Sequence, residues 1–219
     1  MEKREKPVMI DGKVIAKTIK EEIAKEVQDL LTEGKRPPHL VAVIVGEDGA
    51  SLSYVASKEK QSKEVGFTSS VYRFPESISE KELLETLDFL NKDPEVDGYI
   101  VQLPLPKHIN ERKVLEAIAP SKDVDGFHPS NGGRMMLGMP TYIPATPYGI
   151  KQLLDRSNIE TEGKHCVVLG RSNIVGTPMA ILMSRNSKKA NCTVTLCHSK
   201  TKNIKEICSS ADILIVAIG

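Results

Sequence analysis

The chain has 219 residues, a mass of 24.1 kDa and a formal net charge of +1. Its 40% hydrophobic and 27% charged residues are typical of a folded globular protein, and the balanced charge gives no reason to expect nucleic acid or a membrane surface as a partner. Because the apolar runs are far shorter than the ~20 residues that cross a bilayer, and no apolar stretch follows the charged N-terminus, we expect a cytoplasmic protein.

Helical and extended patterns alternate along the first half of the chain. Apolar residues recur at helical spacing over 15–31, and Gly34 follows as the expected C-terminal cap. The run 40–45 has no polar face, which predicts a strand buried in a parallel sheet. Ser51 is expected to cap the next helix, which ends at Gly66. Further along we expect a strand over 68–74, a helix over 83–90 opened by a Ser79–Glu82 capping box, a strand over 98–103 and a short helix over 114–118.

The segment 121–144 has a different composition. It is rich in Gly, Pro, Asp and Asn, with only a short apolar stretch near its middle. Loops of this length inside compact domains are usually functional or are linkers, so we predict a long loop here. Thr146 and Pro147 then fit an N-cap followed by proline at the first helical position. We place a domain boundary at this helix, which divides the chain into 1–145 and 146–219.

Strands and helices alternate again after this boundary. We expect strands over 166–169, 193–197 and 213–218, with one helix beginning at Pro178 and a short one over 204–208. This is the pattern of a βαβαβ mononucleotide-binding half, which makes the second domain Rossmann-like. The chain is therefore predicted to be an α/β protein of two units, without an internal sequence repeat.

The four cysteines and five histidines form no metal-binding or disulfide pattern. No pair of cysteines has C-x-x-C spacing, and most lie in or beside apolar runs, where cysteine behaves as a small buried hydrophobe. The histidines are scattered and include no H-x-x-x-H pair. We therefore expect no metal site and no disulfide framework.

A glycine-bounded turn, Gly170–Gly176, joins the first strand of the second domain to its helix. Backbone N–H groups and the helix dipole at such a turn attract phosphate. Ser172 occupies the second glycine position of the G-x-G-x-x-G pattern, so a turn without a ligand is the alternative. The next strand ends without the carboxylate that binds the ribose of NAD. Arg171, Ser199 and Lys200 are instead suited to a 2′-phosphate, which favours NADP.

Tyr54 and Lys58 lie four residues apart in a predicted helix, so they share one face. A solvated helix surface is the common interpretation of such a pair. The functional interpretation is a lysine whose pKa falls in a desolvated cleft, so that it exchanges protons near neutral pH while the phenol orients it. The spacing alone leaves both interpretations open.

Two further groups of polar residues have a structural and a functional interpretation. Gln102 lies at the carboxyl end of a predicted strand, where α/β proteins bind ligands, although a strand can also simply end in a polar residue. Asp123 and Asp125 belong to a D-x-D-G sequence that is often only a turn. The spacing of an EF-hand is absent, so calcium is not indicated.

These features occur together and in order along the chain. In this combination the chain resembles the bifunctional methylenetetrahydrofolate dehydrogenase/cyclohydrolase family over nearly its whole length. Each motif is modest alone, but six in the same order are specific. The motifs are Tyr54-x-x-x-Lys58, Val101-Gln-Leu-Pro-Leu105, Lys122-Asp-Val-Asp-Gly126, Pro144-x-Thr-Pro147, Gly170-Arg-Ser-x-Ile-Val-Gly176-x-Pro178 and His198-Ser-Lys-Thr201.

The resemblance implies an enzyme that oxidises 5,10-methylenetetrahydrofolate with NADP and hydrolyses the methenyl product to 10-formyltetrahydrofolate. It implies a folate-binding catalytic domain over 1–145 and a Rossmann-like NADP-binding domain over 146–219. It also implies a homodimer formed through the cofactor domains. Members of the family continue beyond the position of Gly219, so only the first βαβαβ half of the second domain is expected here. A non-catalytic NADP- or folate-binding fragment is the alternative.

The same resemblance gives individual residues a role. Lys58 is expected to transfer the protons of hydrolysis, and Tyr54 to stack on the folate. Gln102 is expected to hydrogen-bond Lys58 and tune it, while Asp125 anchors the amino groups of the pterin ring. Val101 and Leu103 are expected to contact the folate, and NADP is expected at Gly170, Arg171, Ser172 and Ser199.

Overall fold

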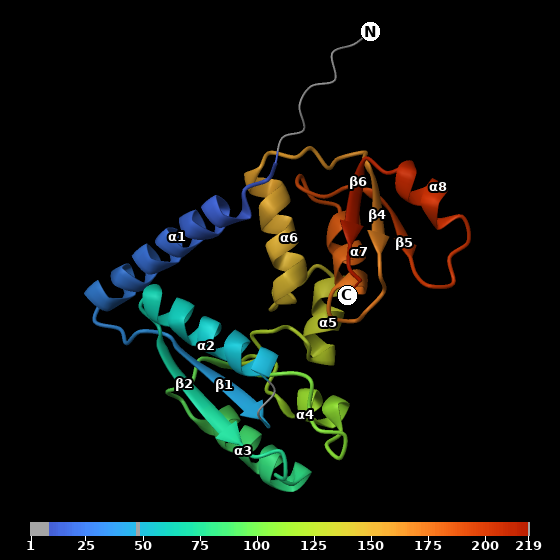
Figure 1. Ribbon diagram of the computed structural model, residues 1–219. Coiled ribbons are helices and arrows are strands. Elements are labelled where there is room, and N and C mark those ends of the chain that lie inside the picture. The colour runs from blue at the N-terminus through green and yellow to red at the C-terminus, as the bar shows by residue number, and fades with distance from the viewer. Residues whose placement is uncertain (1–8, 47–48, 219) are drawn as a thin grey trace.

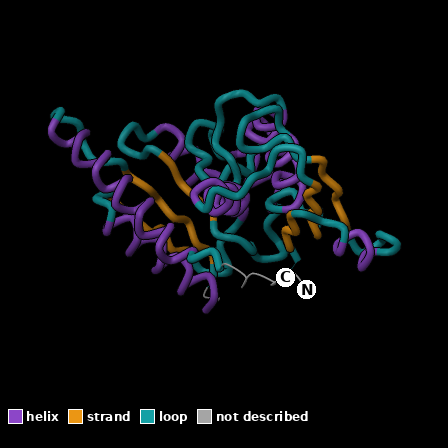
Figure 2. The backbone as a smooth tube through the Cα atoms, turned by 90° about the horizontal axis from the view of Figure 1, so that it is seen from above, coloured by secondary structure: helices purple, strands orange, loops and turns teal. Residues whose placement is uncertain are grey.

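The computed structural model describes residues 9–46 and 49–218 and confirms an α/β fold. The strands form two parallel sheets of three strands each, in the orders β2-β1-β3 and β5-β4-β6. The sheets lie in separate halves of the molecule (Figure 1). Seen from above, helices and loops lie between them (Figure 2). Across the described residues, no helix is long and apolar enough to span a membrane.

Two βαβαβ units make up most of the fold. The first unit contains β1 (His39–Val45), α2 (Gly49–Glu64), β2 (Thr68–Phe74), α3 (Glu80–Lys92) and β3 (Gly98–Val101). The second unit contains β4 (His165–Leu169), α7 (Gly176–Ser184), β5 (Thr193–Cys197), α8 (Ile204–Ser209) and β6 (Ile213–Val216). The other helices of the described part are α1 (Gly12–Thr32), α4 (Glu111–Ala117), α5 (Pro129–Met136) and α6 (Ala145–Arg156).

The sheet of the first unit is buried on both faces. On one face, Ala42 and Ile44 of β1 pack against Val55 of α2. This double burial explains why the run of β1 has no polar position. The other face packs against α3 and α4 and includes Val41, Val43, Tyr99 and Val101 of the strands with Leu83, Leu87 and Leu90 of α3.

The second unit has its own core, to which the two preceding helices contribute. Cys166 of β4 packs in one cluster with Met179 and Met183 of α7. Met135 of α5 and Leu154 of α6 belong to the same cluster. Helix α5 therefore packs with the second unit, although its residues precede the boundary expected from the sequence. The buried cysteines are Cys166, Cys192 and Cys197, as expected.

Helix α1 connects the two units. Its amino end is capped by Asp11, whose side chain accepts from the backbone N–H of Lys13 (3.0 Å). Arg156 of α6 donates to both carboxylate oxygens of Glu22 (2.8 and 2.6 Å), and Lys20 pairs with Glu64 of α2 (2.8 Å). The helix thus fixes α2 and α6 relative to each other, and these two helices carry opposite walls of the site described below.

The ends of several elements follow the sequence signals. Gly34 has φ +75° just after α1, as a helix C-terminal glycine requires. The predicted capping box opens α3, because the Glu82 N–H donates to Ser79 Oγ (3.2 Å) and the Ser79 N–H donates to the Glu82 carboxylate (3.0 Å). Helix α2, in contrast, begins at Gly49, so Ser51 lies inside its first turn and is not the N-cap.

The long loop predicted over 121–144 is wrong in its middle, where α5 forms. Pro129 occupies the first turn of this helix, and His128 Nδ1 accepts from the backbone N–H of Ser130 (3.0 Å). The side chain of Met135 is buried in the second core. This tertiary burial stabilises a helix whose two central glycines argue against it locally.

Other element boundaries also differ from the sequence prediction. Helix α6 begins at Ala145 without a side-chain cap, so Thr146 is not its N-cap. Helix α7 begins at Gly176, two residues before Pro178. Strands β3 and β6 end at Val101 and Val216, earlier than predicted. Pro104, inside the range predicted for β3, has no N–H to donate to a neighbouring strand.

Candidate active site

A cleft of about 210 Å³ lies where the carboxyl ends of the first unit's strands face the glycine-bounded turn of the second unit. Ligands of open α/β sheets bind at this end of the strands. The structure brings together here all the residues for which the sequence predicts contact with folate. They are Tyr54, Lys58, Val101, Gln102, Leu103 and Asp125.

Helix α2 presents Tyr54 and Lys58 side by side toward this cleft. Lys58 Nζ lies 4.6 Å from the centre of the Tyr54 ring, which is a cation–π contact. The Lys58 side chain is only 25% exposed, whereas Tyr54 is 55% exposed. The pair therefore differs from a solvated helix surface: the cation is largely buried and the ring is open to a ligand.

Asp125 faces Lys58 from the loop after α4. The distance from Lys58 Nζ to Asp125 Oδ1 is 3.8 Å, and the Asp125 side chain is 19% exposed. Burial lowers the pKa of Lys58, although attraction to Asp125 offsets part of this shift. Burial likewise raises the pKa of Asp125, against the attraction of Lys58. Both shifts favour the neutral forms, so a proton leaves Lys58 Nζ more easily than it leaves a solvated lysine.

Gln102 lies in the cleft wall but does not hydrogen-bond Lys58, so that part of the prediction is wrong. Its Nε2 donates instead to the Leu103 carbonyl (2.7 Å). Its backbone N–H donates to the Val43 carbonyl (2.8 Å), which extends the ladder one step past β3. The amide thus folds back onto its own chain, and Asp125 occupies the position beside Lys58 that the sequence assigned to Gln102.

The turn after β4 is shaped by its two glycines. Gly170 has φ +121°, and a Cβ atom there would lie 2.2 Å from the Ala217 carbonyl oxygen. A Cβ atom on Gly176 would lie 2.1 Å from the Gly170 carbonyl oxygen. Only glycine fits either position, and the turn leads directly into the amino end of α7. This cradle fits the pyrophosphate of a dinucleotide, which such turns bind through backbone N–H groups and the helix dipole.

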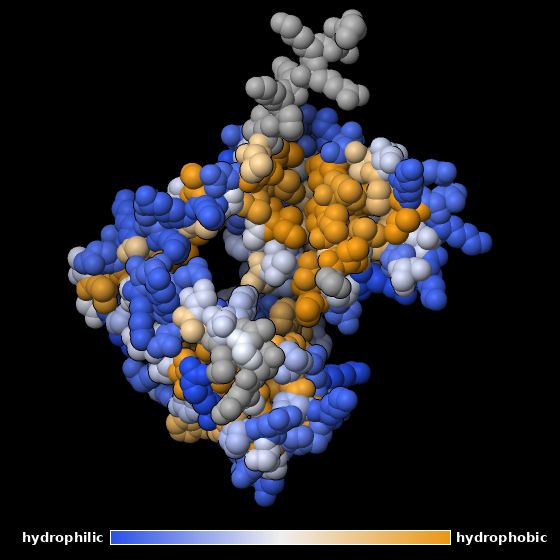
Figure 3. All heavy atoms as spheres, viewed as in Figure 1, coloured by the Kyte–Doolittle hydropathy of each residue, from blue (hydrophilic) through white to orange (hydrophobic). Residues whose placement is uncertain are grey.

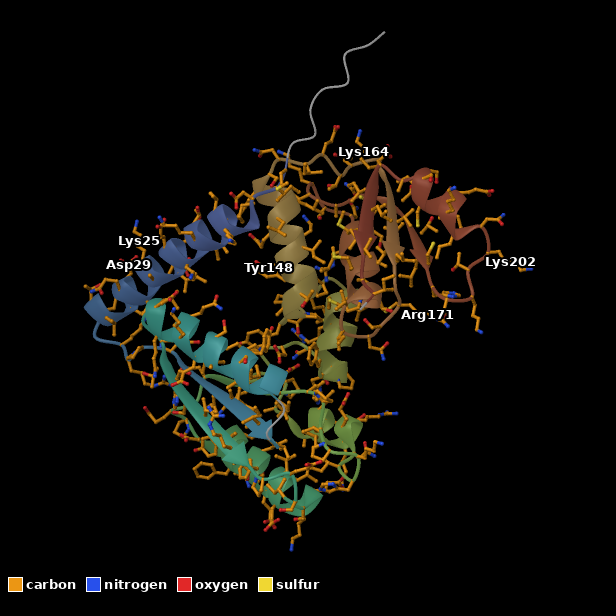
Figure 4. All side chains as sticks on the ribbon, viewed as in Figure 1. Lys25, Asp29, Tyr148, Lys164, Arg171 and Lys202 are labelled. Carbon is orange, nitrogen blue, oxygen red and sulfur yellow. The ribbon has the colours of Figure 1, made fainter. Side chains whose placement is uncertain are left out.

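The other residues expected at the cofactor lie in this turn or on the loop after the neighbouring strand β5. Ser172 Oγ accepts from the N–H groups of Val175 (3.1 Å) and Gly176 (3.4 Å), so its hydroxyl stabilises the turn itself. Arg171 and Ser199 are exposed, on the loops that follow the neighbouring strands β4 and β5. Figure 4 shows Arg171 on the first of these loops and Lys202 farther along the second.

The cleft also contains residues for which the sequence predicted no contact with folate. Thr146 and Ala145 come from the first turn of α6, where the sequence predicts only a helix cap. Ile174 and Val175 come from the turn after β4. The sequence did hold a signal for these two residues: apolar side chains in a phosphate-binding turn indicate that the turn also contacts a second ligand. No sequence signal pointed to Phe127.

Comparison with known proteins identifies the family. Residues 10–125 match the model of the tetrahydrofolate dehydrogenase/cyclohydrolase catalytic domain, and residues 144–219 match that of the NAD(P)-binding domain. The chain is 58% identical to the bifunctional protein FolD of Cytophaga hutchinsonii and 57% identical to that of Porphyromonas gingivalis. Each alignment covers 96% of this chain, with 73% and 71% of the respective relatives.

Solved structures agree with this result. The FolD methylenetetrahydrofolate dehydrogenase/cyclohydrolase of Campylobacter jejuni superposes with a TM-score of 0.92 at 44% identity, over 97% of this chain and 74% of that one. The Trypanosoma brucei enzyme, solved with NADP and an inhibitor, gives a TM-score of 0.91 at 34% identity, over 98% and 73%. With both family domains matched and the predicted residues gathered in one cleft, the chain belongs to the tetrahydrofolate dehydrogenase/cyclohydrolase family.

Proposed function

We propose that the cleft between the two units binds the tetrahydrofolate substrate and that Lys58 transfers the protons of the hydrolytic step. The protein is a methylenetetrahydrofolate dehydrogenase and methenyltetrahydrofolate cyclohydrolase of one-carbon folate metabolism, with NADP as its cofactor. The observation that carries the proposal is the contact between Lys58, Tyr54 and Asp125 in a cleft that also includes the turn after β4.

Hydrolysis of the methenyl carbon needs a group that both accepts and returns a proton. Water forms its bond to this carbon as it loses a proton, and the carbon–nitrogen bond then breaks as the nitrogen gains one. Lys58 is suited to both steps because burial lowers its pKa, which increases the fraction of neutral amine near neutral pH. The ammonium form of Lys58 produced by the first step then supplies the proton for the second step.

Asp125 and Tyr54 supply binding and orientation in this proposal. The pterin ring presents amino and N–H donors, and a carboxylate forms charge-assisted hydrogen bonds with such donors, about twice as strong as neutral ones. Asp125 has this chemistry and lies 3.8 Å from Lys58 Nζ, so it would place the reacting carbon next to the lysine. The exposed Tyr54 ring offers a flat surface for the aromatic part of the folate.

Gly170, Arg171, Ser172 and Ser199 would hold NADP in the second unit. When bound, NADP would supply the acceptor for the hydride that leaves the methylene carbon. The glycine positions admit the pyrophosphate, and Arg171 offers a guanidinium on an exposed loop for the 2′-phosphate. Ile174 and Val175 belong both to this turn and to the cleft wall, which would bring cofactor and folate close together.

We also propose a domain division at residues 145 and 146 and a homodimer formed through the second unit. The division is supported by the family match that begins at residue 144, next to this boundary, although α5 precedes it and packs with the second core. The dimer is supported by a broad hydrophobic area over the second unit and α6 (Figure 3). Light scattering on purified protein tests the dimer, and a concentration-independent monomer mass would contradict it.

The test of the proposed function is Lys58→Met, which keeps an apolar stem but cannot transfer protons. We expect hydrolysis of methenyltetrahydrofolate to fall by roughly 10²- to 10⁴-fold, with folate binding retained. A melting curve checks that the variant is folded, because loss of Lys58 leaves the buried Asp125 carboxylate without its partner and should lower the stability.

Lys60→Met is the matched control, since Lys60 is an exposed lysine on the same helix. It should hydrolyse the substrate normally. Near-normal hydrolysis by Lys58→Met would contradict the proposal, as would an equal loss in both variants.

A further inference from the structure

The loop that carries Asp125 is held to the first unit at several points. The N–H of Tyr99 in β3 donates to the Lys122 carbonyl (2.9 Å). Lys122 Nζ donates to the carbonyl oxygens of Leu90 and Asp93 at the end of α3 (2.8 and 2.5 Å). Val124 packs closely over Gly98: a Cβ atom on Gly98 would lie 2.3 Å from Val124 Cγ1. This loop is therefore part of the rigid structure.

Asp123 is a buried member of this loop, with 1% of its surface exposed. Its Oδ2 accepts two hydrogen bonds, from the backbone N–H of His128 (2.8 Å) and from Nδ2 of Asn131 (2.8 Å). Asn131, itself 3% exposed, also donates to the Pro120 carbonyl (3.0 Å). A buried carboxylate with these partners folds the chain tightly on both sides of Asp125.

The same network reaches the opposite wall of the cleft. Thr141 Oγ1 donates to Asn131 Oδ1 (2.7 Å). Thr141 lies on the segment that leads from α5 into α6, whose first turn forms the wall facing Asp125. Beside it, the backbone of Gly126 approaches Pro144 so closely that a Cβ atom would lie 2.8 Å from Pro144 N. The hydrogen bonds of Asp123 and Asn131 thus connect the two walls.

We propose that Asp123, through Asn131, is a positioning residue for the hydrolytic reaction: it holds Asp125 opposite Lys58 and fixes the loop to the segment that enters α6. This inference rests on the proposed role of the Lys58–Asp125 pair. Asp123 does not line the cleft, so it acts through Asp125 and not on the substrate itself.

The charge of Asp123 adds an electrostatic effect to this geometry. The pKa of Asp125 is raised first by burial, and Asp123 raises it further while Lys58 lowers it. Lys58 from α2 and Asp123 from the same loop are therefore the charged groups that act on Asp125. Neutralising Asp123 should make Asp125 ionise at lower pH, because a neighbouring negative charge is lost.

Two substitutions separate geometry from charge. Asp123→Asn keeps an acceptor for the His128 N–H but removes the charge, whereas Asp123→Ala removes both. We expect Asp123→Ala to lower kcat for methenyltetrahydrofolate hydrolysis by roughly ten- to a hundredfold, the scale expected when a reacting group is misplaced by about 1 Å. Asp123→Asn should keep most of kcat but move the acid limb of the pH–rate profile to lower pH.

Two further variants distinguish a loss of positioning from a general loss of protein stability. Asp97→Asn is the matched control, because Asp97 accepts the backbone N–H of His39 (2.7 Å) at the opposite end of the same sheet. It should lower the melting temperature without moving the pH profile. Thr141→Val keeps the side-chain shape, removes only the donor to Asn131, and should lower kcat by roughly two- to fivefold.

The reference variants Lys58→Met and Asp125→Asn make the outcomes distinct. Their loss of hydrolysis, together with the effects expected for the Asp123 variants, supports the inference. Suppose that Lys58→Met and Asp125→Asn lose hydrolysis while Asp123→Ala and Asp123→Asn keep the kcat and pH profile of the parent protein. The role of Asp123 is then overturned, and the proposed function stands. A profile shift of equal size in Asp97→Asn also overturns the role of Asp123. Normal hydrolysis by Lys58→Met overturns the proposed function, and this inference with it.

Discussion

The two βαβαβ units fix the amino ends of their strands in the same way. In the first unit the N–H of His39 donates to Asp97 Oδ2 (2.7 Å), and in the second the N–H of His165 donates to Asp212 Oδ2 (2.8 Å). In return, each aspartate donates its own N–H to the carbonyl of that histidine (3.1 and 3.0 Å). In each sheet, the first strand is therefore joined to the residue before the third strand by the same pair of hydrogen bonds.

The histidine rings repeat the same arrangement. His39 Nε2 lies 2.9 Å from Ser70 Oγ on β2, and His165 Nε2 lies 3.0 Å from Thr195 Oγ1 on β5. The other ring nitrogen of each faces a carbonyl oxygen in the turn before the third strand (3.1 and 3.2 Å). The fold thus repeats itself although the sequence shows no repeat, because only a few residues per unit carry the shared pattern.

The carboxyl ends of the same strands differ, and they are where the ligands are expected. Strand β1 has seven residues and ends before Gly46, whereas β4 has five and ends before Gly170. Gln102 in the first unit and Ala217 in the second take equivalent places, each donating its N–H to the first strand of its sheet (2.8 and 2.7 Å). The amino ends supply a common scaffold, while differences at the carboxyl ends make one unit a folate site and the other a nucleotide site.

The largest effect that would test this comparison is expected for Gly176→Ala. The new Cβ atom would lie 2.1 Å from the Gly170 carbonyl oxygen, so the turn must open. We expect NADP binding to be lost and the free energy of unfolding to fall by about 3 kcal/mol or more. Calorimetric titration with NADP and chemical denaturation measure both.

Gly46→Ala is the control from the first unit. Its φ is +84°, but a Cβ atom there would have 3.8 Å to its nearest neighbour. We therefore expect only backbone strain of about 1–2 kcal/mol and unchanged NADP binding. Equal NADP affinity in both variants would show that the turn after β4 has no special role.

A smaller effect is expected for Arg171→Ala, which tests what the second unit recognises. Loss of one charge-assisted contact costs about 1.5–3 kcal/mol, so NADP should bind roughly tenfold or more weakly. NAD has no 2′-phosphate and should be much less affected. Equal losses for the two dinucleotides, measured by titration, would show that Arg171 does not read this phosphate.

The smallest effects are expected for His39→Ala and His165→Ala, which test whether the amino ends of the two sheets are equivalent. Each removes two ring contacts from a half-buried position, so each should lower the free energy of unfolding by about 1–2 kcal/mol. Neither should change kcat or NADP affinity, because both rings lie at the far end of the strands. If denaturation experiments gave very different losses of unfolding free energy for the two variants, the hydrogen bonds of His39 and His165 would not be equivalent.

The sequence predicted most of the scaffold because the scaffold depends on local patterns. A buried apolar run and a capping box reveal β1 and α3 without knowledge of the rest of the molecule. Helix α5 was missed because burial of Met135 against a distant core stabilises it. The predicted contact between Gln102 and Lys58 failed for a similar reason, since the direction of a side chain at a strand end depends on neighbours distant in sequence.

The proton-transfer role of Lys58 is tested most directly by an NMR titration of its Nζ, assigned by comparison with Lys58→Met. We expect its pKa to lie below the ordinary lysine value of 10.5, because burial disfavours the ammonium form. In Asp125→Asn the pKa should fall further, since the carboxylate that favours the ammonium form is gone. A Lys58 pKa at or above 10.5 in the parent protein, or one that Asp125→Asn leaves unchanged, would contradict the proposal that this pair forms the proton-transfer site.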